Sequence, residues 1–273
     1  MHELLYDVNS GGIALALLLG MVVFVEIGWR LGMRVRNAKS EPAKDHIYGV
    51  QASMLGILGL LLGFTFSLSL QRYESRSEVV QEEANAIGTT YLRADLLPEA
   101  QREPSRRLLR EYVNLRAEAS EPRNAEHAAQ ERLARAAQQK HSELWALASA
   151  GVAADGAPAR SGLYVQSLNE LIDVFDKRRA ELARHVPEVV LIVLFGTFLL
   201  AGSVVGFACG VGGHRPPIVT YMMVALIVVV VFLILDLDRP RRGLILVSQQ
   251  SLVELRDAVL QEGGGVGSRP SSR

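Results

Sequence analysis

The chain has 273 residues, of which 49% are hydrophobic, and its 29 basic residues balance its 29 acidic residues. A net charge of zero, without a basic stripe along the sequence, gives no reason to expect a nucleic acid as a partner. The single cysteine, Cys209, excludes an internal disulfide, and its place in an apolar run favours a buried side chain.

Four long apolar segments occur in chain order, at about 12–31, 50–70, 189–209 and 218–235. The last is the shortest, with 18 residues, which span about 27 Å as a helix and just cross the hydrocarbon core of a bilayer. Three segments contain no charged residue, and the first contains only Glu26 and, at its end, Arg30. Buried helices of soluble proteins rarely run so long without charge, so we expect four transmembrane helices in a lipid bilayer.

Residues 1–44 are expected to hold the first transmembrane helix and a connecting loop. The leader MHELLYDVNS has no Lys or Arg, and the apolar run lacks a small-x-small cleavage site, so a cleaved signal peptide is not expected. Glu26 precedes Arg30 by four residues. This spacing favours an ion pair on one helix face, although an acid within a membrane segment can also be functional.

Residues 45–97 are expected to form one helix that crosses the membrane and continues into water as a stalk. Asp45 is a good N-cap, and the apolar run passes into QRYESRSEVVQEEANAI without a turn. There is no glycine between Gly63 and Gly88, and there is no proline from 45 to 97. A helix of these 53 residues is about 80 Å long.

Residues 98–186 are expected to form a helical region in water. PSRRLLREYVNLRAEA places Pro104 in the first turn of a helix, and an Ala-rich stretch of high helix propensity follows. GVAADGAPARSG predicts a flexible surface loop. The last helix of the region is expected to run towards Pro187 and into the third membrane helix.

Residues 187–237 are expected to form the third and fourth transmembrane helices, joined by the tight turn GVGGHRPP. In the tail, 238–273, we expect an extended stretch at 244–247 and a helix opened by a capping box of Ser251 and Glu254. EGGGVGSRPSSR predicts a disordered end. The fold class is therefore all-α, a polytopic membrane protein whose helical cytoplasmic domain consists largely of extended membrane helices.

Four crossings place the N-terminus, the insert between the second and third membrane helices, and the tail on one side of the membrane. Near the membrane, that side has nine Lys and Arg residues and the other side has six. This excess favours a cytoplasmic insert. However, five of the six lie in one short loop, where the positive-inside rule is most reliable, so charge alone leaves the orientation open.

Three separated stretches carry a resemblance to a known family: GLLLGFTFSLSLQRYESR, EEANAIGTTYLRADLLP and LDLDRPRRGLILVSQQ. Over most of residues 45–255 the chain is similar to the bestrophin-like family of bacterial membrane proteins of unknown function. More distantly, Gly63 and Phe64, followed by Arg72, Tyr73 and Glu74, resemble a motif of true bestrophins.

True bestrophins are homopentameric ion channels, mostly anion-selective, with four membrane helices per subunit and a cytoplasmic helical body. The resemblance therefore implies a homo-oligomer, a pentamer by analogy, in the bacterial inner membrane, with the insert and both termini cytoplasmic. It implies a pore lined by the second membrane helix, with inorganic ions, chloride first, as the permeant species. The sequence departs from true bestrophins at their calcium site: Asp236 and Asp238 are two carboxylates where calcium takes six to eight oxygens. We expect no metal and no cofactor.

Candidates for a pore neck lie four residues apart in the second membrane segment: Leu60, Phe64 and Leu68. A ring of such side chains would gate by dewetting, although packed or lipid-facing residues explain the pattern equally well. The nearby hydroxyl residues are Thr65, Ser67 and Ser69. They could contact a permeating anion, or bond back to the helix carbonyl four residues earlier.

Candidates for a pore mouth follow at the membrane exit: Arg72, Glu74 and Arg76. A ring of Arg72 side chains would concentrate anions there. A solvated helix end with local ion pairs is the simpler interpretation. Asp236 and Asp238, at the end of the fourth helix, are interpreted as structural anchors.

Small residues recur at four-residue spacing, which allows close approach of helix backbones in lipid. The members are Gly28 and Gly32 in the first helix, Gly59 and Gly63 in the second, and Gly202, Gly206 and Gly210 in the third. Packing within one subunit and packing between subunits both remain open.

No catalytic arrangement is present in the sequence. The six histidines form no metal-spaced pair, and there is no glycine-rich phosphate loop, no nucleophile elbow and no cysteine cluster. We therefore expect no enzyme. The sequence favours an ion channel, and the alternative is a non-conducting scaffold or signalling protein whose cytoplasmic helices bind a partner. The absence of an ionisable pair in mid-membrane argues against a secondary transporter.

Overall fold

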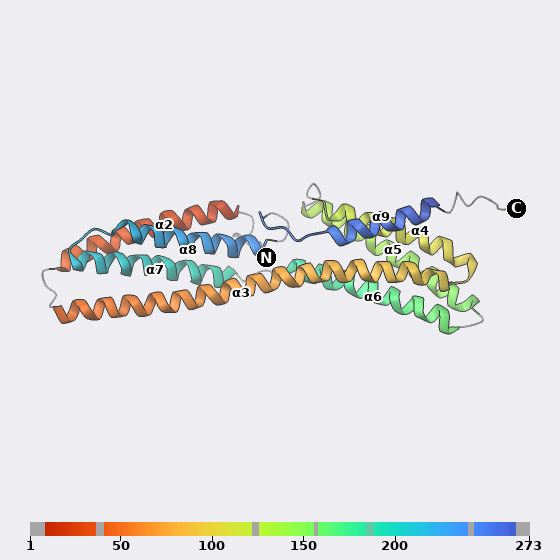
Figure 1. Cartoon of the computed structure of the whole chain (residues 1–273), viewed down its shortest axis with the longest axis horizontal. Coiled ribbons are helices and arrows are strands. Elements are labelled where there is room, and N and C mark those ends of the chain that lie inside the picture. Colours follow the sequence, from red (N-terminus) through yellow and green to blue (C-terminus); the bar gives the residue numbers. More distant parts are fainter. Residues whose placement is uncertain are drawn as a thin grey trace. The chain divides into compact units, whose positions relative to one another are not determined.

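The computed structural model describes residues 9–36, 41–121, 126–155, 158–184, 186, 188–239 and 243–265. These residues contain no β-strand, so the predicted all-α fold is confirmed (Figure 1). The chain divides into two units. The first comprises Met1–Tyr73 and His185–Ile245, and the second comprises Glu74–Arg184 and Leu246–Arg273.

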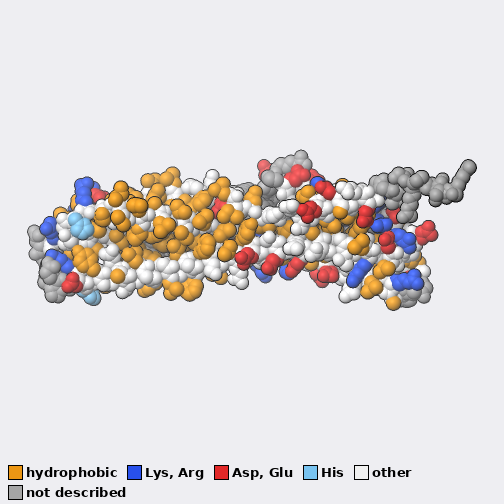
Figure 2. All heavy atoms as spheres, in the orientation of Figure 1, with side chains coloured by type: hydrophobic (Ala, Val, Ile, Leu, Met, Phe, Trp, Pro, Cys, Tyr) orange, Lys and Arg blue, Asp and Glu red, His pale blue; other side chains and the backbone are white. Residues whose placement is uncertain are grey.

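The first unit contains the helices that are long and apolar enough to cross a membrane. They are α2 (Ser10–Val35), the first part of α3 (Glu41–Arg93), α7 (Glu188–Gly212) and α8 (Ile218–Leu237). Hydrophobic side chains cover the visible surface over α2, α7 and α8, whereas charged side chains gather over the second unit (Figure 2). The four predicted transmembrane segments are thus present as helices.

The backbones of α2 and α7 touch because glycines on both helices remove the side chains between them. A Cβ atom at Gly28 would overlap the carbonyl oxygen of Ser203, and one at Gly206 would overlap the carbonyl oxygen of Val25. Gly32 and Gly210 repeat this contact one turn further along. Close approach of this kind increases van der Waals contact, which is what stabilises helix pairs in lipid.

The core of the first unit is apolar and comes from all four of its helices. Its fully buried members include Met21 and Val25 of α2, Phe198 of α7 and Val224 of α8. Helix α3 joins this core through Leu58. The partly buried side chains of α3 that pack against the same core are Met54, Leu55 and Leu62.

The second unit is a bundle of amphipathic helices. It contains the end of α3, which closes in the 3-10 turn η2 (Ala94–Leu96), and α4 (Glu99–Ala119), α5 (His127–Ala154), α6 (Pro158–Ala183) and α9 (Gln250–Gly265). On α3 the buried side chains follow helical spacing: Val79, Val80, Glu83, Ala84, Ala86, Ile87, Thr90 and Tyr91. The other helices of the unit also bury apolar side chains, among them Leu109, Leu144, Leu171 and Leu252.

Helix α3 is continuous through residues 68–76, where the apolar sequence becomes charged. Its 53 residues measure about 80 Å along the helix. A single helix therefore contributes to both units, as expected for a domain built on an extended membrane helix.

Several predicted helix starts are wrong by a few residues. Helix α3 begins at Glu41, so Asp45 is not its N-cap. Helix α4 begins at Glu99 with Pro98 as N-cap, which places Pro104 inside the helix and not in its first turn. Helix α9 begins at Gln250, and the carbonyl of Gln249 accepts the first helical bonds, so Ser251 does not open a capping box.

Two predicted connections and the predicted C-terminal end also differ from the structure. The expected loop of GVAADGAPARSG is mostly helical, because α5 continues to Ala154 and α6 begins at Pro158. Helix α6 ends at Ala183, and α7 begins at Glu188, so they do not form one rod. Helix α9 runs to Gly265, and the rest of the predicted disordered end, 266–273, lies outside the described residues.

Candidate functional site

The part of α3 that belongs to the first unit, Glu41–Tyr73, is called the membrane half here. It presents an apolar face that its own chain does not cover. The exposed fractions of the predicted neck residues are 59% for Leu60, 61% for Phe64 and 54% for Leu68. On the same half of the helix, a Cβ atom at Gly59 or Gly63 would meet no atom within 4 Å. These two glycines therefore do not pack within the subunit, in contrast to Gly202, Gly206 and Gly210.

The hydroxyl groups near this face have different surroundings. Thr65 is buried, and its Oγ1 donates to the carbonyl of Leu61 at 2.7 Å, the back-bond expected of a helical threonine. Ser69, one turn later, is buried, and its Oγ has no hydrogen-bond partner. Of the three hydroxyl residues, Ser67 is the exposed one.

Arg72 has a specific partner at the membrane exit. One of its terminal nitrogens, Nη1, lies 3.3 Å from Oδ1 of Asp238, and the Arg72 side chain is 29% exposed. The other carboxylate oxygen of Asp238 accepts the backbone N–H of Val186 at 3.0 Å. Asp238 thus joins α3, the backbone two residues before α7 and the end of α8.

Asp236 fixes the chain that leaves α8. Its carboxylate accepts the backbone N–H groups of Leu244 at 2.9 Å and Ile245 at 2.8 Å. A Cβ atom at Gly243 would lie 2.8 Å from Oδ1 of Asp236, which leaves room for glycine alone. Asp236 and Asp238 both have the anchoring contacts that the sequence favoured. Among the described residues, no group of three or more His, Cys, Asp or Glu side chains could hold a metal.

Arg76, the second cation of the predicted mouth, is buried in the second unit. Its Nη2 donates to the carbonyl of Arg184 at 2.7 Å, and its Nε donates to the carbonyl of Glu181 at 3.4 Å. These carbonyls lie at the C-terminal end of α6, where a cation satisfies unpaired acceptors and the helix dipole. Glu74 is exposed. The three predicted mouth residues therefore occupy three different environments.

Glu26, the acid within the first membrane segment, pairs with Arg30. Nε of Arg30 lies 2.8 Å from Oε1 of Glu26, and both side chains are exposed. This is the ordinary ion pair that the four-residue spacing predicted.

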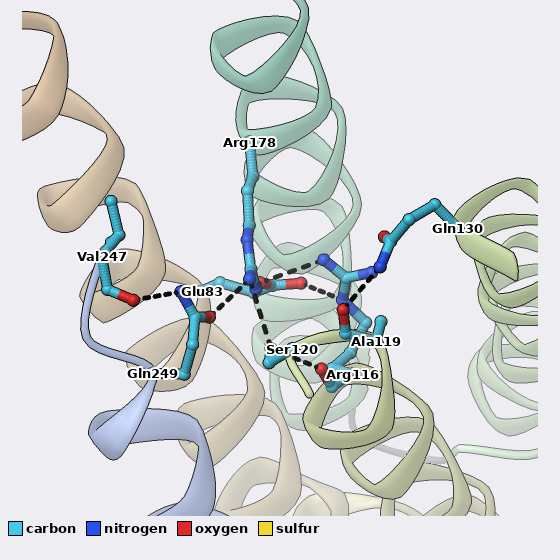
Figure 3. Close-up of polar contacts among 8 residues, drawn as sticks. All are labelled: Glu83, Arg116, Ala119, Ser120, Gln130, Arg178, Val247 and Gln249. Carbon is cyan, nitrogen blue, oxygen red and sulfur yellow. Dashed lines mark hydrogen bonds and ion pairs between the residues drawn. The ribbon is translucent and has the colours of Figure 1, made fainter. Parts of the chain in front are cut away.

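The sequence interpretation missed a buried charged cluster in the second unit, made of Glu83, Arg116 and Arg178 (Figure 3). Glu83 is fully buried on α3. Arg116 of α4 donates from Nε to Oε1 of Glu83 at 2.5 Å and from Nη2 to Oε2 at 3.3 Å. Arg178 of α6 donates from Nη1 to Oε2 of the same carboxylate. One carboxylate therefore links three helices.

The cluster also reaches the segment before α9. Nη2 of Arg178 donates to Oε1 of Gln249 at 2.7 Å and lies 3.4 Å from Oγ of Ser120 (Figure 3). The amide of Gln249 then donates to the carbonyl of Val247 at 3.0 Å. The guanidinium of Arg178 therefore binds both Glu83 and Gln249, the residue that precedes α9.

The electrostatics of the cluster favour a charged Glu83. Burial by itself raises the pKa of the Glu83 carboxyl, but the guanidinium groups of Arg116 and Arg178 outweigh burial and hold that pKa below its usual value. A buried carboxylate of this kind is costly unless it is paired and hydrogen-bonded, and here both oxygens have partners.

His141 of α5 lies beside this cluster. Its ring centroid is 5.0 Å from that of Tyr112 and 4.9 Å from that of Phe175. Burial, followed by the positive charge of Arg116, lowers the pKa of His141 to about 4. The imidazole is therefore neutral at neutral pH and serves as a packed ring.

A signal for the cluster was present in the sequence. Glu83 lies on the apolar stripe of its helix with Val80 and Ile87, and Arg116 follows Tyr112 by four residues. Charged residues on an apolar stripe must pair when the stripe is buried. The helical pattern alone could not show which acid meets which base.

A family model for the bestrophin-like domain matches residues 19–252. The chain belongs to the bestrophin-like family. The resemblance that the three sequence stretches carry is therefore confirmed.

Solved structures support the same fold. Two crystal structures of single-substitution variants of a bacterial bestrophin homolog from Klebsiella pneumoniae match the chain with TM-scores of 0.60. The first is 15% identical, and the match covers 91% of this chain and 99% of that chain. The second is 18% identical, with coverage of 92% and 97%. At these identities the likeness shows the fold. No curated protein matches the chain.

Proposed function

We propose that this bestrophin-like protein is the subunit of a homo-oligomeric ion channel, and that the membrane half of α3 lines its pore. The observation that supports the proposal is the uncovered apolar face of α3 with Leu60, Phe64 and Leu68 in a chain of bestrophin fold. In a ring of subunits around one axis, α3 from each copy would face the axis, and Phe64 would form a narrow apolar neck.

The proposed permeant species is a small anion, with chloride as the first to test. The analogy with bestrophin channels supports this choice and a ring of five subunits. Ser67, exposed on the same half of α3, offers a hydroxyl donor to an anion in the pore. Permeation through such a pore requires no cofactor.

The proposed location is the bacterial inner membrane, with the second unit and both termini in the cytoplasm. If all four candidate spans cross the membrane, the start of α2, the second unit and the segment after α8 share one side, which supports a common location. The basic excess near that side of the membrane favours the cytoplasm.

The alternative function is a non-conducting membrane scaffold or signalling protein. Apolar side chains on the outside of the second unit favour it: Trp145 and Val152 of α5 and Leu163 of α6 are exposed. A partner helix could cover such residues. The two functions differ in whether the assembled protein conducts ions.

The decisive experiment reconstitutes the full chain in liposomes and measures chloride efflux under an applied gradient. We expect efflux from the wild type, and faster efflux from Phe64→Ala because truncation widens and hydrates the neck. Leu19→Ala is the matched control, because Leu19 is similarly exposed, at 58%, on α2. Its efflux should equal that of the wild type. Absence of efflux from all three proteins, with insertion and assembly verified, would favour the scaffold.

A further inference from the structure

Arg72 is the first Lys or Arg on α3 after Lys44, so it is the cation nearest the proposed neck on that helix. Its side chain is held by Asp238, which lies 166 residues away in the sequence. A charge that is paired in this way exerts a weaker field on ions passing α3 than a free charge would.

Asp238 is placed where its own helix does not favour it. It is the C-cap of α8, and a carboxylate at a helix C-terminus is opposed by the helix dipole. The side chain is also 2% exposed, so its charge needs compensation. Arg72 supplies a positive charge, and the N–H of Val186 supplies a hydrogen bond.

We propose that Asp238 is a positioning residue for Arg72 that sets how strongly the pore prefers anions over cations. This inference rests on the proposed channel function. While Asp238 holds Arg72, the two charges largely offset each other at the membrane exit of α3. Loss of the Asp238 charge releases Arg72, whose guanidinium then attracts anions to the exit. Asp238 acts through Arg72 and does not itself meet the permeating ion.

Asp236 provides a matched control within the same turn of α8. It is as buried as Asp238, at 2% exposure, but its carboxylate accepts backbone N–H groups of Leu244 and Ile245. Asp236→Asn and Asp238→Asn therefore remove equal charge from neighbouring positions of one helix end. A difference between them reports on the contact with Arg72.

The first experiment measures reversal potentials of the full-length protein in planar bilayers under a sodium chloride gradient. We expect Asp238→Asn to raise the chloride-over-sodium permeability ratio about threefold or more. Asp236→Asn should leave the ratio unchanged, and Asp238→Glu, which keeps the charge, should stay near the wild type. In an Arg72→Gln background, Asp238→Asn should have no further effect. Equal ratios for the two Asn variants, or an effect that persists without Arg72, would overturn the proposal.

The second experiment does not depend on conduction. A double-mutant cycle of Arg72→Gln and Asp238→Asn, followed by thermal unfolding in detergent, should be non-additive, whereas the cycle with Asp236→Asn should be additive. Additivity in the Arg72 and Asp238 cycle would overturn the inference and leave the channel untouched. Non-additivity in a protein that passes no ions would show the contact but overturn both functional proposals.

Discussion

The two halves of α3 are one helix with opposite packing. In the second unit, Val79, Val80 and Ile87 are buried within the chain. In the membrane half, Leu60 and Phe64 remain exposed. The polar half therefore completes its core with residues of its own subunit, whereas the membrane half leaves a face for lipid or for other copies. Such an uncovered face is what the proposed oligomer would require.

The two units also differ in what holds their helices together. The second unit buries apolar stripes away from water and ties three helices to one carboxylate, Glu83. Between membrane helices no such hydrophobic driving force acts, because lipid is as apolar as the side chains. In the first unit, van der Waals contact between the backbones of α2 and α7 at Gly28 and Gly206 takes the place of hydrophobic burial.

The largest expected effect tests the charged cluster of the second unit. Glu83→Gln leaves the buried guanidinium groups of Arg116 and Arg178 without a counter-charge, so we expect a loss of about 3–5 kcal/mol in the free energy of unfolding. Denaturant unfolding of the purified protein in detergent measures it. The neighbouring Glu82→Gln breaks only an exposed pair with Lys177, and should cost less than about 1 kcal/mol. Equal losses would mean that the cluster does not stabilise the unit.

The next effect is a dependence of the second unit's stability on pH. The pKa of His141 is lowered to about 4 in the folded chain, so between pH 6.5 and 4 the unfolded chain binds a proton that the folded chain does not. Stability is therefore complete above pH 6.5 and falls as the pH drops towards 4, by about 2–3 kcal/mol.

His141→Phe removes this titration and should flatten stability between pH 6.5 and 4.5, whereas the exposed His46→Phe should keep the wild-type slope. Glu83 does not contribute to the slope between pH 6.5 and 4.5, because the pKa of its carboxyl lies below the ordinary value of 4.5. The stability that charged Glu83 supplies is lost only below that range. A slope that survives in His141→Phe would assign it to another group.

Much of the fold could be predicted from the sequence because its signals are local. The four apolar segments and the absence of glycine and proline from 64–87 predicted four membrane helices and a continuous α3. Helix starts were less predictable. Pro104 and Ser251 are plausible first-turn and cap residues, but α4 begins directly after Pro98 and α9 directly after Gln249. Local propensity is a weak guide to such starts because tertiary context overrides it.

The candidate site was less predictable because its partners are distant in sequence. The sequence predicts that Arg72 and Arg76 lie at a membrane exit, but it could not show what they contact. Asp238 and the carbonyl of Arg184 lie 166 and 108 residues from them. Arg72 therefore pairs with the buried Asp238, whereas Arg76 donates to carbonyls at the C-terminal end of α6. The two arginines have these different partners although they are only four residues apart.

A smaller effect tests the glycine contact of the first unit. Gly206→Val places a side chain against the carbonyl of Val25, so α2 and α7 must separate, at an expected cost of about 1–3 kcal/mol. Gly196→Val, on the same helix, meets no atom within 4 Å. Thermal unfolding in detergent should show a clear loss for Gly206→Val and little change for Gly196→Val. Similar melting of both would argue against close packing of α2 on α7.

The smallest effect on the subunit is expected at Gly63, where the comparison of the two halves of α3 is most direct. Gly63→Leu adds a side chain where the subunit has no atom within 4 Å, so the stability of the subunit should change by less than about 0.5 kcal/mol. If other copies cover this face, however, the same side chain stands between subunits, and cross-linking should show fewer complete oligomers. Gly196→Leu, equally open on α7, should assemble as the wild type does. Normal assembly of Gly63→Leu would mean that other copies do not pack at Gly63, which then faces lipid or the pore, and the contact between copies would lie elsewhere.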